Sequence, residues 1–462
     1  MGSMFSSTIA AVSTPRGRGG IAVIRISGDE ALAICEKFIF PRVPLSNIES
    51  RRATLCRVCG SNGETLDEAV VTVFRAPHSY TGEDTVEISC HGSEILCGEI
   101  LRRAFECGAV QAGPGEFTRR AFSAGKLSLT EAEAVIGMID AKSESALRLS
   151  RKNLDGTLSS EIDKIYNRIT NVVGSVYAGI DFPDEDLASS TEDEMAVQTR
   201  EVISMLEKLG ASYKTGHAVC EGVQTVICGK PNTGKSTLLN LLSGHDRAIV
   251  TDIAGTTRDV ITDTVVIGDI TLMISDTAGI HDTSDEIERI GVSRSLDAIL
   301  KSELVIAVFD SSRALDDEDM NVISLAREAE ERGACVIAVV NKTDLERSCD
   351  EKIIRESFKN VLFMSAKSDD DREALSHALN ELIIGGKVDL SSDAVVTNVR
   401  QHASICRALE LCKSAESAIY TLGTDIAGSE LERAMSELSQ LDGRSVGIDI
   451  VNDIFHRFCV GK

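Results

Sequence analysis

The chain has 462 residues, with 48 basic and 72 acidic side chains, and its formal charge is −24. This charge opposes long-range attraction to nucleic-acid backbones and to anionic lipid, so any nucleic-acid partner needs local help. The 13 cysteines are scattered, and neither a signal peptide nor an apolar run of about 18 residues is visible. We therefore expect a multidomain cytoplasmic protein with reduced thiols and no membrane partner.

A first domain of mixed α+β structure is predicted over residues 1–126. Short β-rich runs such as GIAVIRIS and DTVEISCHG lie among helical patterns such as SEILCGEILRRAFECG. Cys56 and Cys59 have the spacing of a zinc knuckle or a redox dithiol. A structural zinc site needs four ligands and no second close pair follows, so ordinary buried thiols are the favoured interpretation and zinc is the alternative.

Two helical stretches flank the middle of the chain. Apolar residues recur at helical spacing over residues 127–217, with one break at DFPDED, and again over residues 387–462. The second stretch is too short to form a sizeable domain alone. We therefore expect both stretches to complete one discontinuous all-helical domain, into which residues 218–386 are inserted.

The inserted residues alternate apolar strands with helical patterns, as in VQTVICG, LVIAVFD and CVIAVVN. This alternation is typical of parallel βα units and predicts a Rossmann-like α/β domain. After the first strand, GKPNTGKST places Gly229, Gly234, Lys235 and Ser236 in the Gly-x4-Gly-Lys-Ser pattern. The glycines let backbone N–H groups surround phosphates, Lys235 reaches the outer phosphates, and Ser236 is a ligand for Mg²⁺.

Four further motifs follow in the order expected of a GTP-binding domain. DTAG ends a strand, where Asp276 can hold the water shell of the metal and Gly279 can sense the outermost phosphate. NKTD also ends a strand, and Asp344 would accept the guanine N1–H and the exocyclic amine, which adenine does not offer together. SAK supports the guanine carbonyl, and GTTRD supplies the mobile Thr257 to the Mg²⁺ shell. The sequence therefore predicts binding of GTP and GDP with Mg²⁺.

The group that positions water for hydrolysis is not assigned by these motifs. A glutamine follows the DTAG-type glycine in Ras-type enzymes, whereas this chain has Ile280. The stretch SDEIERIG offers Asp285, Glu286 and Glu288, and spacing alone neither chooses among them nor excludes a solvated helix face. The positive charge of an arginine finger is also unassigned.

Several longer sequence segments together resemble those of one known family. They include TPRGRGGIAVIRISG and PGEFTRRAFSAGKLSLTEAEAV, TDIAGTTRD and DTAG…SDEIERIG, and the terminal FCVGK. On these segments the chain resembles the MnmE family of bacterial tRNA modification GTPases, also called TrmE. The resemblance implies a dimerising, tetrahydrofolate-binding N-terminal domain, a discontinuous helical domain and an inserted Ras-like G domain.

The resemblance also implies a site for a tetrahydrofolate derivative, in the 5,10-methylene or 5-formyl form. By position, the folate contacts fall on Arg25, Glu87, Lys126 and Lys462. Reduced folate has an anionic glutamate tail that suits Arg and Lys, and a pterin whose donor edge suits a carboxylate. A structural ion pair is the alternative for Arg25 and Glu87. Cys459, in the terminal Cys-x-Gly-Lys box, is a candidate for one-carbon chemistry or else a structural thiol.

For hydrolysis, the resemblance implies that K⁺ replaces the arginine finger and that Glu288 positions water. His281 stands where family members carry arginine. The implied K⁺ ligands are Asn232, Thr251, Ile253 and Thr256, and the Mg²⁺ ligands are Ser236, Thr257 and Asp276. The other nucleotide contacts would be Thr233, Gly234, Lys235, Thr237, Asp252, Ala254, Gly255, Thr277, Ala278, Gly279, Asn341, Lys342, Thr343, Asp344, Ser365, Ala366 and Lys367.

The implied function is the formation of an aminomethyl-type group at C5 of the wobble uridine of tRNA. The implied partners are a second copy of the chain and MnmG, which carries the FAD. The alternative is a regulatory or ribosome-assembly GTPase that acts as a switch without one-carbon chemistry. Such proteins usually append a basic RNA-binding module, and the acidic helices over residues 387–462 show none.

Overall fold

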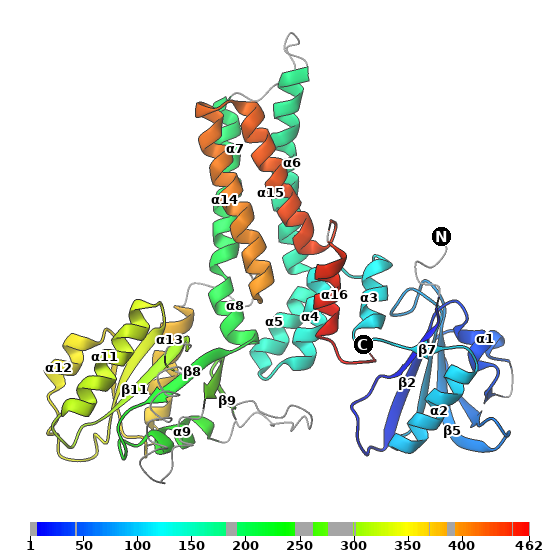
Figure 1. Cartoon of the computed structure of the whole chain (residues 1–462), viewed down its shortest axis with the longest axis horizontal. Coiled ribbons are helices and arrows are strands. Elements are labelled where there is room, and N and C mark those ends of the chain that lie inside the picture. Colours follow the sequence, from blue (N-terminus) through cyan, green and yellow to red (C-terminus); the bar gives the residue numbers. More distant parts are fainter. Residues whose placement is uncertain are drawn as a thin grey trace. The chain divides into compact units, whose positions relative to one another are not determined.

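The structure is a computed structural model that describes residues 7–41, 44–181, 192–244, 262–275, 299, 302–368, 370–385, 393–445 and 447–461. The chain forms two compact units (Figure 1). The first unit combines both ends of the sequence, Met1–Ile136 with Ser439–Lys462, and the second is the middle, Gly137–Leu438.

A seven-stranded mixed sheet forms the centre of the first unit. Its strands lie in the order β3-β4-β5-β6-β2-β1-β7, and all neighbours are antiparallel except β1 and β7. The bounds are β1 Ile9–Val12, β2 Ile21–Ser27, β3 Ile39–Phe40, β4 Ala53–Cys59, β5 Thr65–Phe74, β6 Thr85–His91 and β7 Val110–Gln111, with a 3-10 helix at Leu45–Asn47.

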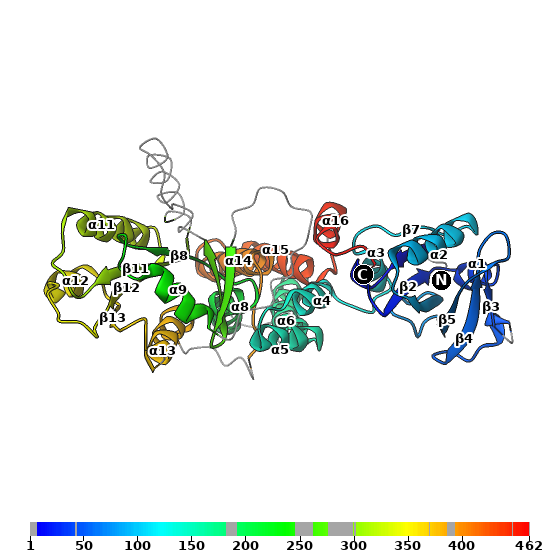
Figure 2. The same ribbon diagram turned by 90° about the horizontal axis from the view of Figure 1, so that it is seen from below.

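Side chains alternate between the two faces of this sheet. In β2, Ile24 and Ile26 are fully buried, whereas Arg25 between them lies on the opposite face and is partly exposed. Helices α1 (Ala31–Cys35) and α2 (Glu94–Glu106) pack on the face of the two isoleucines and complete an apolar core with them (Figure 2). Polar side chains such as Arg25 therefore lie on the second face of the sheet.

Helix α3 (Glu116–Ser123) contributes to the second face near β1. Its Phe117 is fully buried against Ile9 and Ala11. Farther along the sheet, Leu55 of β4 and Val70 of β5 pair in register. Both are exposed, by 64% and 40%. This second face is thus buried at one end and leaves apolar side chains exposed at the other.

The C-terminal part of the first unit packs on helices that follow the sheet in sequence. In α16 (Ile448–His456), Phe455 joins an apolar cluster with Leu129 of α4 (Leu129–Asp140). The ring of Phe455 also lies 6.2 Å from that of Phe122 in α3. These aromatic contacts hold the last residues of the chain in the first unit.

Helices from two separate parts of the sequence stand side by side in the second unit, where α6 and α14 both contact α7 (Figures 1 and 2). Arg200 and Glu416 form an ion pair across α7 and α14, with 2.6 Å between Nε and Oε1. The bounds are α5 Glu144–Leu154, α6 Thr157–Asp181, α7 Glu192–Ala211, α8 Tyr213–Cys220, α14 Val399–Thr421 and α15 Thr424–Asp442.

A six-stranded sheet forms the rest of the second unit, in the order β13-β12-β11-β8-β10-β9. All neighbours are parallel except β9 and β10. Separate apolar clusters lie on its two faces, which is why its inner strands are continuous apolar runs. The bounds are β8 Val223–Cys228, β9 Thr262–Ile267, β10 Ile270–Ser275, β11 Leu304–Asp310, β12 Cys335–Asn341, β13 Val361–Phe363, α9 Lys235–Ser243, α11 Asp317–Glu331, α12 Glu351–Ser357 and α13 Asp370–Ile384.

The predicted fold class is confirmed: a mixed α+β region, helices from two stretches, and an α/β domain inserted between them. Strand β9, at the edge of its sheet, was not predicted, because its threonines and aspartate interrupt the apolar run. Strand β4 was also missed, and it contains Cys56 and Cys59 as buried free thiols. Within the described part of the chain, no helix has both the length and the apolar character needed to cross a membrane.

Candidate functional site

The phosphate loop, residues 229–236, connects β8 to α9 at the carboxyl edge of the second sheet. Gly229 has φ +149°, and a Cβ there would lie 2.4 Å from the carbonyl oxygen of Val308. Gly234 has φ +97°, and its Cβ would lie 2.1 Å from Nδ2 of Asn341. Only glycine fits at both places, so the loop can turn its N–H groups toward a ligand at the N-terminus of α9.

Lys235 is held inside this loop by neutral groups. Its Nζ donates hydrogen bonds to the carbonyl oxygens of Gly229, at 2.9 Å, and Lys230, at 2.8 Å. Burial lowers the pKa of the Lys235 ammonium, because water is removed from the charged form. An anionic phosphate would restore that lost solvation, so the geometry favours an anion beside Lys235.

The predicted base-recognition motifs meet the phosphate loop directly. Asn341 ends β12, where its Nδ2 donates to the carbonyl of Thr233 at 2.8 Å and its Oδ1 accepts from the N–H of Ala366 at 2.8 Å. Ser365 Oγ donates to Oδ1 of Asp344 at 2.8 Å. The side chain of Asn341 thus connects the phosphate loop to the loop that would support the guanine.

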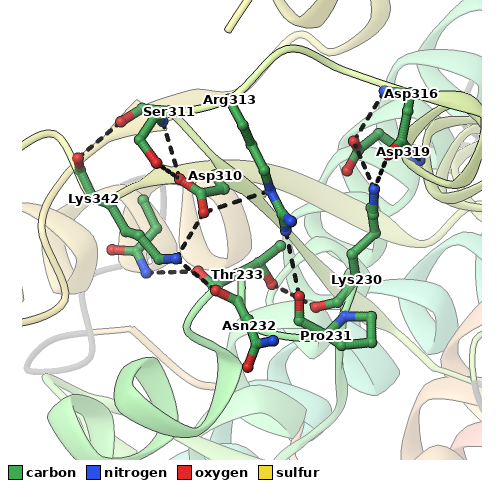
Figure 3. Close-up of polar contacts among 12 residues, drawn as sticks. Lys230, Pro231, Asn232, Thr233, Asp310, Ser311, Arg313, Asp316, Asp319 and Lys342 are labelled. Carbon is green, nitrogen blue, oxygen red and sulfur yellow. Dashed lines mark hydrogen bonds and ion pairs between the residues drawn. The ribbon is translucent and has the colours of Figure 1, made fainter. Parts of the chain in front are cut away.

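A carboxylate that the sequence analysis missed occupies the end of β11. Asp310 accepts hydrogen bonds from Nζ of Lys342, at 2.6 Å, and from the hydroxyl of Ser312, at 2.7 Å (Figure 3). Burial opposes ionisation of Asp310, but these hydrogen bonds outweigh it and lower its pKa. Lys342 also donates to the carbonyl of Asn232 at 2.6 Å. The position of Asp310 at the end of an apolar strand was the available signal.

The nucleotide residues predicted from the sequence fall into two groups. Those from 232 to 237, from 341 to 344 and from 365 to 367 are described, and the hydrogen bonds above bring the three segments together at one sheet edge. The others lie outside the described residues: Thr251, Asp252, Ile253, Ala254, Gly255, Thr256, Thr257, Asp276, Thr277, Ala278, Gly279 and Glu288.

A second polar cluster lies in the first unit, on the second face of its sheet. Arg25 and Glu87 are register partners in β2 and β6. Nε of Arg25 donates to Oε1 of Glu87 at 2.9 Å, and a second guanidinium nitrogen lies 2.8 Å from the same oxygen. The guanidinium also lies 5.3 Å from the ring centre of Tyr80 and 5.5 Å from that of Phe117. Arg25 is therefore fixed by a carboxylate and by two aromatic rings.

Lys126 reaches the same neighbourhood from the end of α3. Its Nζ donates to the carbonyl oxygens of Pro77, at 3.0 Å, and Ser79. The segment that Lys126 binds leads directly to Tyr80, which contacts Arg25. Three of the four predicted folate contacts thus gather around this segment, and the fourth, Lys462, lies outside the described residues.

The terminal box lies against the first unit rather than extending from it. Val460 forms a β-bridge with Pro114, and the N–H of Gly115 donates to the carbonyl of Cys459 at 3.4 Å. Ser13 Oγ donates to the carbonyl of Gly461 at 2.8 Å. The Cys459 side chain is exposed. Ser13 directly follows β1, whose Ala11 pairs with Arg25, so the box lies near the second polar cluster.

Similar proteins identify the family of the chain. A family model described as the MnmE helical domain matches residues 129–459, and one described as the GTP-binding protein TrmE N-terminus matches residues 8–126. The chain belongs to the MnmE family. Its relatives include the tRNA modification GTPase MnmE of Caldicellulosiruptor saccharolyticus, 38% identical over 98% of this chain and 99% of the relative. The tRNA modification GTPase MnmE of Symbiobacterium thermophilum is 38% identical over 99% of this chain and 100% of the relative.

Solved structures align over smaller parts of the chain. Era of Aquifex aeolicus is 22% identical over 40% of this chain and 65% of its own, with a TM-score of 0.27. The G domain of the T. maritima iron transporter FeoB is 22% identical over 34% of this chain and 96% of its own, with a TM-score of 0.26. The family membership rests on the sequence relatives. This MnmE-family protein is a GTPase of tRNA modification.

Proposed function

We propose that this GTPase installs an aminomethyl-type group at C5 of the wobble uridine of tRNA, using a one-carbon unit from a tetrahydrofolate derivative. The observation that carries this proposal is the position of the terminal box against the first unit. A loose chain end would make no defined contacts. Here Val460 bridges to Pro114, and Gly461 accepts a hydrogen bond from Ser13. Because the residues around Cys459 are held in this way, its exposed thiol is the group that we propose for the reaction of the one-carbon unit.

The second polar cluster supports a folate ligand by its mixture of charges. Glu87 offers a carboxylate to the donor edge of a pterin, and the aromatic rings of Tyr80 and Phe117 flank the guanidinium of Arg25. Lys126, held by carbonyl groups that carry no net charge, keeps its positive charge for the glutamate tail. We therefore assign the pterin to Arg25 and Glu87, and the glutamate tail to Lys126 and Lys462.

We propose that K⁺ at the phosphate loop supplies the positive charge that the chain otherwise lacks during hydrolysis. Asn232 is exposed in this loop and has φ +64°, a backbone conformation that asparagine tolerates. Glu288 is proposed to position water, because Ile280 has no group that can do so. Replacement of K⁺ by Na⁺ should slow turnover strongly, and Asn232→Ala should lose that dependence while still binding GTP. Equal turnover in both salts would contradict the K⁺ site.

The proposed assembly is a homodimer that acts on tRNA with the FAD-containing partner MnmG in the cytoplasm. The exposed Leu55 and Val70 lie next to each other on the second face of the first sheet, which suits a second copy of the chain. The acidic net charge of −24 fits a division of labour in which the partner supplies much of the tRNA-binding surface. Reduced cysteines fit a cytoplasmic location.

The experiment that tests the folate proposal uses Gly461→Ala in the full-length protein. Gly461 has φ +103°, and a Cβ there would lie 2.1 Å from the carbonyl oxygen of Val12, so the variant should displace the terminal box. We expect binding of 5-formyltetrahydrofolate, measured by calorimetry, to weaken at least about tenfold, the loss of one charge-assisted hydrogen bond. GTP hydrolysis should be unchanged.

A matched control is Gly98→Ala, because Gly98 lies in α2 of the same unit and a Cβ there would meet nothing within 4 Å. This variant should bind the folate normally. Unchanged folate affinity in Gly461→Ala would remove the box from the site. If the unaltered protein binds no folate, the alternative of a regulatory or ribosome-assembly switch gains support.

A further inference from the structure

We propose that Lys230 is a positioning residue for GTP binding: its side chain ties the phosphate loop to the start of α11 through Asp316 and Asp319. Lys230 is the second residue of the loop and the only lysine there besides Lys235. The two lysines have opposite environments, since Lys235 is surrounded by carbonyl groups and Lys230 by carboxylates. The structure therefore assigns Lys235 to binding the ligand and Lys230 to holding the loop against the rest of the protein.

The contacts of Lys230 show why it does not serve as a phosphate ligand. Its Nζ forms an ion pair with Asp316 and lies 3.6 Å from Oδ2 of Asp319 (Figure 3). It also lies 3.7 Å from Oε2 of Glu318. Only 9% of the Lys230 side chain is exposed. The hydrogen bond between Lys230 and Asp316 raises the pKa of Lys230 and lowers that of Asp316. The charge of Lys230 is thus balanced by three carboxylates of the protein.

The carboxylates are themselves fixed by the first turn of α11. Oδ1 of Asp316 accepts from the N–H groups of Glu318, at 3.0 Å, and Asp319, at 3.3 Å. Oδ2 of Asp319 accepts in return from the N–H of Asp316 at 3.2 Å, which completes a capping box. Asp319 is 3% exposed. Lys230 is therefore anchored to the capped N-terminal end of α11.

Anchoring the side chain of Lys230 constrains the backbone that orients Lys235. Pro231 follows Lys230 and restricts its backbone to extended conformations. The carbonyl oxygen of Lys230 accepts hydrogen bonds from Nζ of Lys235, at 2.8 Å, and from the hydroxyl of Thr233, at 2.9 Å. A shift of Lys230 would therefore move an acceptor of the lysine that meets the phosphates.

The next peptides of the loop are held from the same side. Arg313, which follows β11, donates to the carbonyl of Pro231 at 3.3 Å, and Asn341 donates to that of Thr233 at 2.8 Å (Figure 3). Because a trans peptide is planar, an outward carbonyl turns the following N–H to the opposite side. The N–H groups of Asn232 and Gly234 are thus directed toward the phosphate site before nucleotide binds, and Lys230 begins this series of contacts.

The test measures nucleotide binding and turnover separately in the full-length protein. For Lys230→Met we expect the dissociation constant for a fluorescent GDP analogue and the KM for GTP to rise about tenfold. The kcat at saturating GTP should stay within about twofold, because the bound phosphates reorganise the loop. Lys230→Arg, which keeps the charge, should restore wild-type affinity. A purely structural ion pair would change thermal stability but would not produce this division between KM and kcat.

A second variant approaches the same contact from the helix. Asp316→Asn retains an N-cap side chain and removes the charge that Lys230 needs. It should raise the GDP dissociation constant about tenfold, and it tests the contact independently if Lys230→Met does not fold. The control is Arg332→Met, since Arg332 pairs with Glu328 at 2.6 Å near the other end of α11. Wild-type GDP affinity in Asp316→Asn would overturn the proposal, as would an equal loss in Arg332→Met.

Discussion

Lys235 in the second unit and Arg25 in the first are both cations in proposed ligand sites, and the protein holds them in opposite ways. Carbonyl oxygens surround the Lys235 ammonium, so its full positive charge remains available. Arg25 is paired with the carboxylate of Glu87, so the pair has no net charge. The first arrangement suits phosphates, whereas the second suits a heterocycle that needs both a donor and an acceptor.

Lys126 shows that the difference does not simply follow the two units. It lies in the first unit, yet it is held by the carbonyl groups of Pro77 and Ser79, as Lys235 is held in the phosphate loop. The immediate partner of a cation therefore indicates its task better than its domain does. Cations held by carbonyls are expected to bind anions, and cations paired with carboxylates are expected to orient neutral groups or to stabilise the fold.

The largest effect is expected for Lys235→Met. The phosphate site would lose the one cation in the loop whose charge is not balanced by a carboxylate, so GTP turnover should fall at least about 100-fold. A radiolabelled GTP hydrolysis assay measures this loss. Folate affinity should stay at the wild-type value, since Lys235 lies in the other unit. Residual turnover within tenfold of wild type would show that another group provides the charge.

Effects of intermediate size are expected for Lys126 and Glu87, and two ligands should distinguish the roles of these residues. Lys126→Met should weaken binding of 5-formyltetrahydrofolate about tenfold, but should not change binding of the matching 5-formyltetrahydropterin, which carries no carboxylate. Glu87→Gln should weaken both ligands equally, because it acts on the pterin. Calorimetry with the two ligands measures the four affinities. If Lys126→Met weakens both ligands equally, the rule that carbonyl-held cations bind anions fails for Lys126.

The smallest effect concerns His217, a cation held by two carboxylates. Its ring nitrogens lie 3.0 Å from Glu221 and 3.1 Å from Glu303, and these hydrogen bonds raise its pKa to about 9. Tyr213 in α8 is its aromatic neighbour and in turn stacks on His402 of α14. Because the folded-state pKa exceeds the unfolded one, the stabilisation is complete below about pH 6.5 and is lost as the pH rises through 9.

The measurement is the melting temperature of His217→Gln and of the wild type between pH 6 and 10. Since Glu221 and Glu303 are about half exposed, we expect the charged His217 to stabilise the fold by only about 1–2 kcal/mol at pH 6. The wild type should therefore melt a few °C above His217→Gln at pH 6, and the two melting temperatures should converge near pH 10. His377→Gln is the control, because its pair with Glu381 is exposed and 3.8 Å long. A difference that is independent of pH would exclude the charged pair as its cause.

Features that depend on neighbouring residues could be predicted from the sequence alone. The pattern around Gly229, Gly234 and Lys235 is local, because strand, loop and helix follow one another directly. The apolar runs of β8, β11 and β12 were equally readable, since strands buried on both faces need continuous apolar residues. The resemblance to the MnmE family then predicted that the terminal box belongs with the first domain.

Contacts between residues that are distant in sequence became visible only in the folded chain. The pairing of Lys230 with Asp316, the bond from Lys342 to Asp310 and the docking of Gly461 on Val12 depend on which strand ends meet. No periodicity encodes such meetings, because each requires a chain that has already folded around its cores. For the same reason, spacing could name Arg25 and Lys235 as cations, but only their partners distinguish a neutralised pair from an available charge.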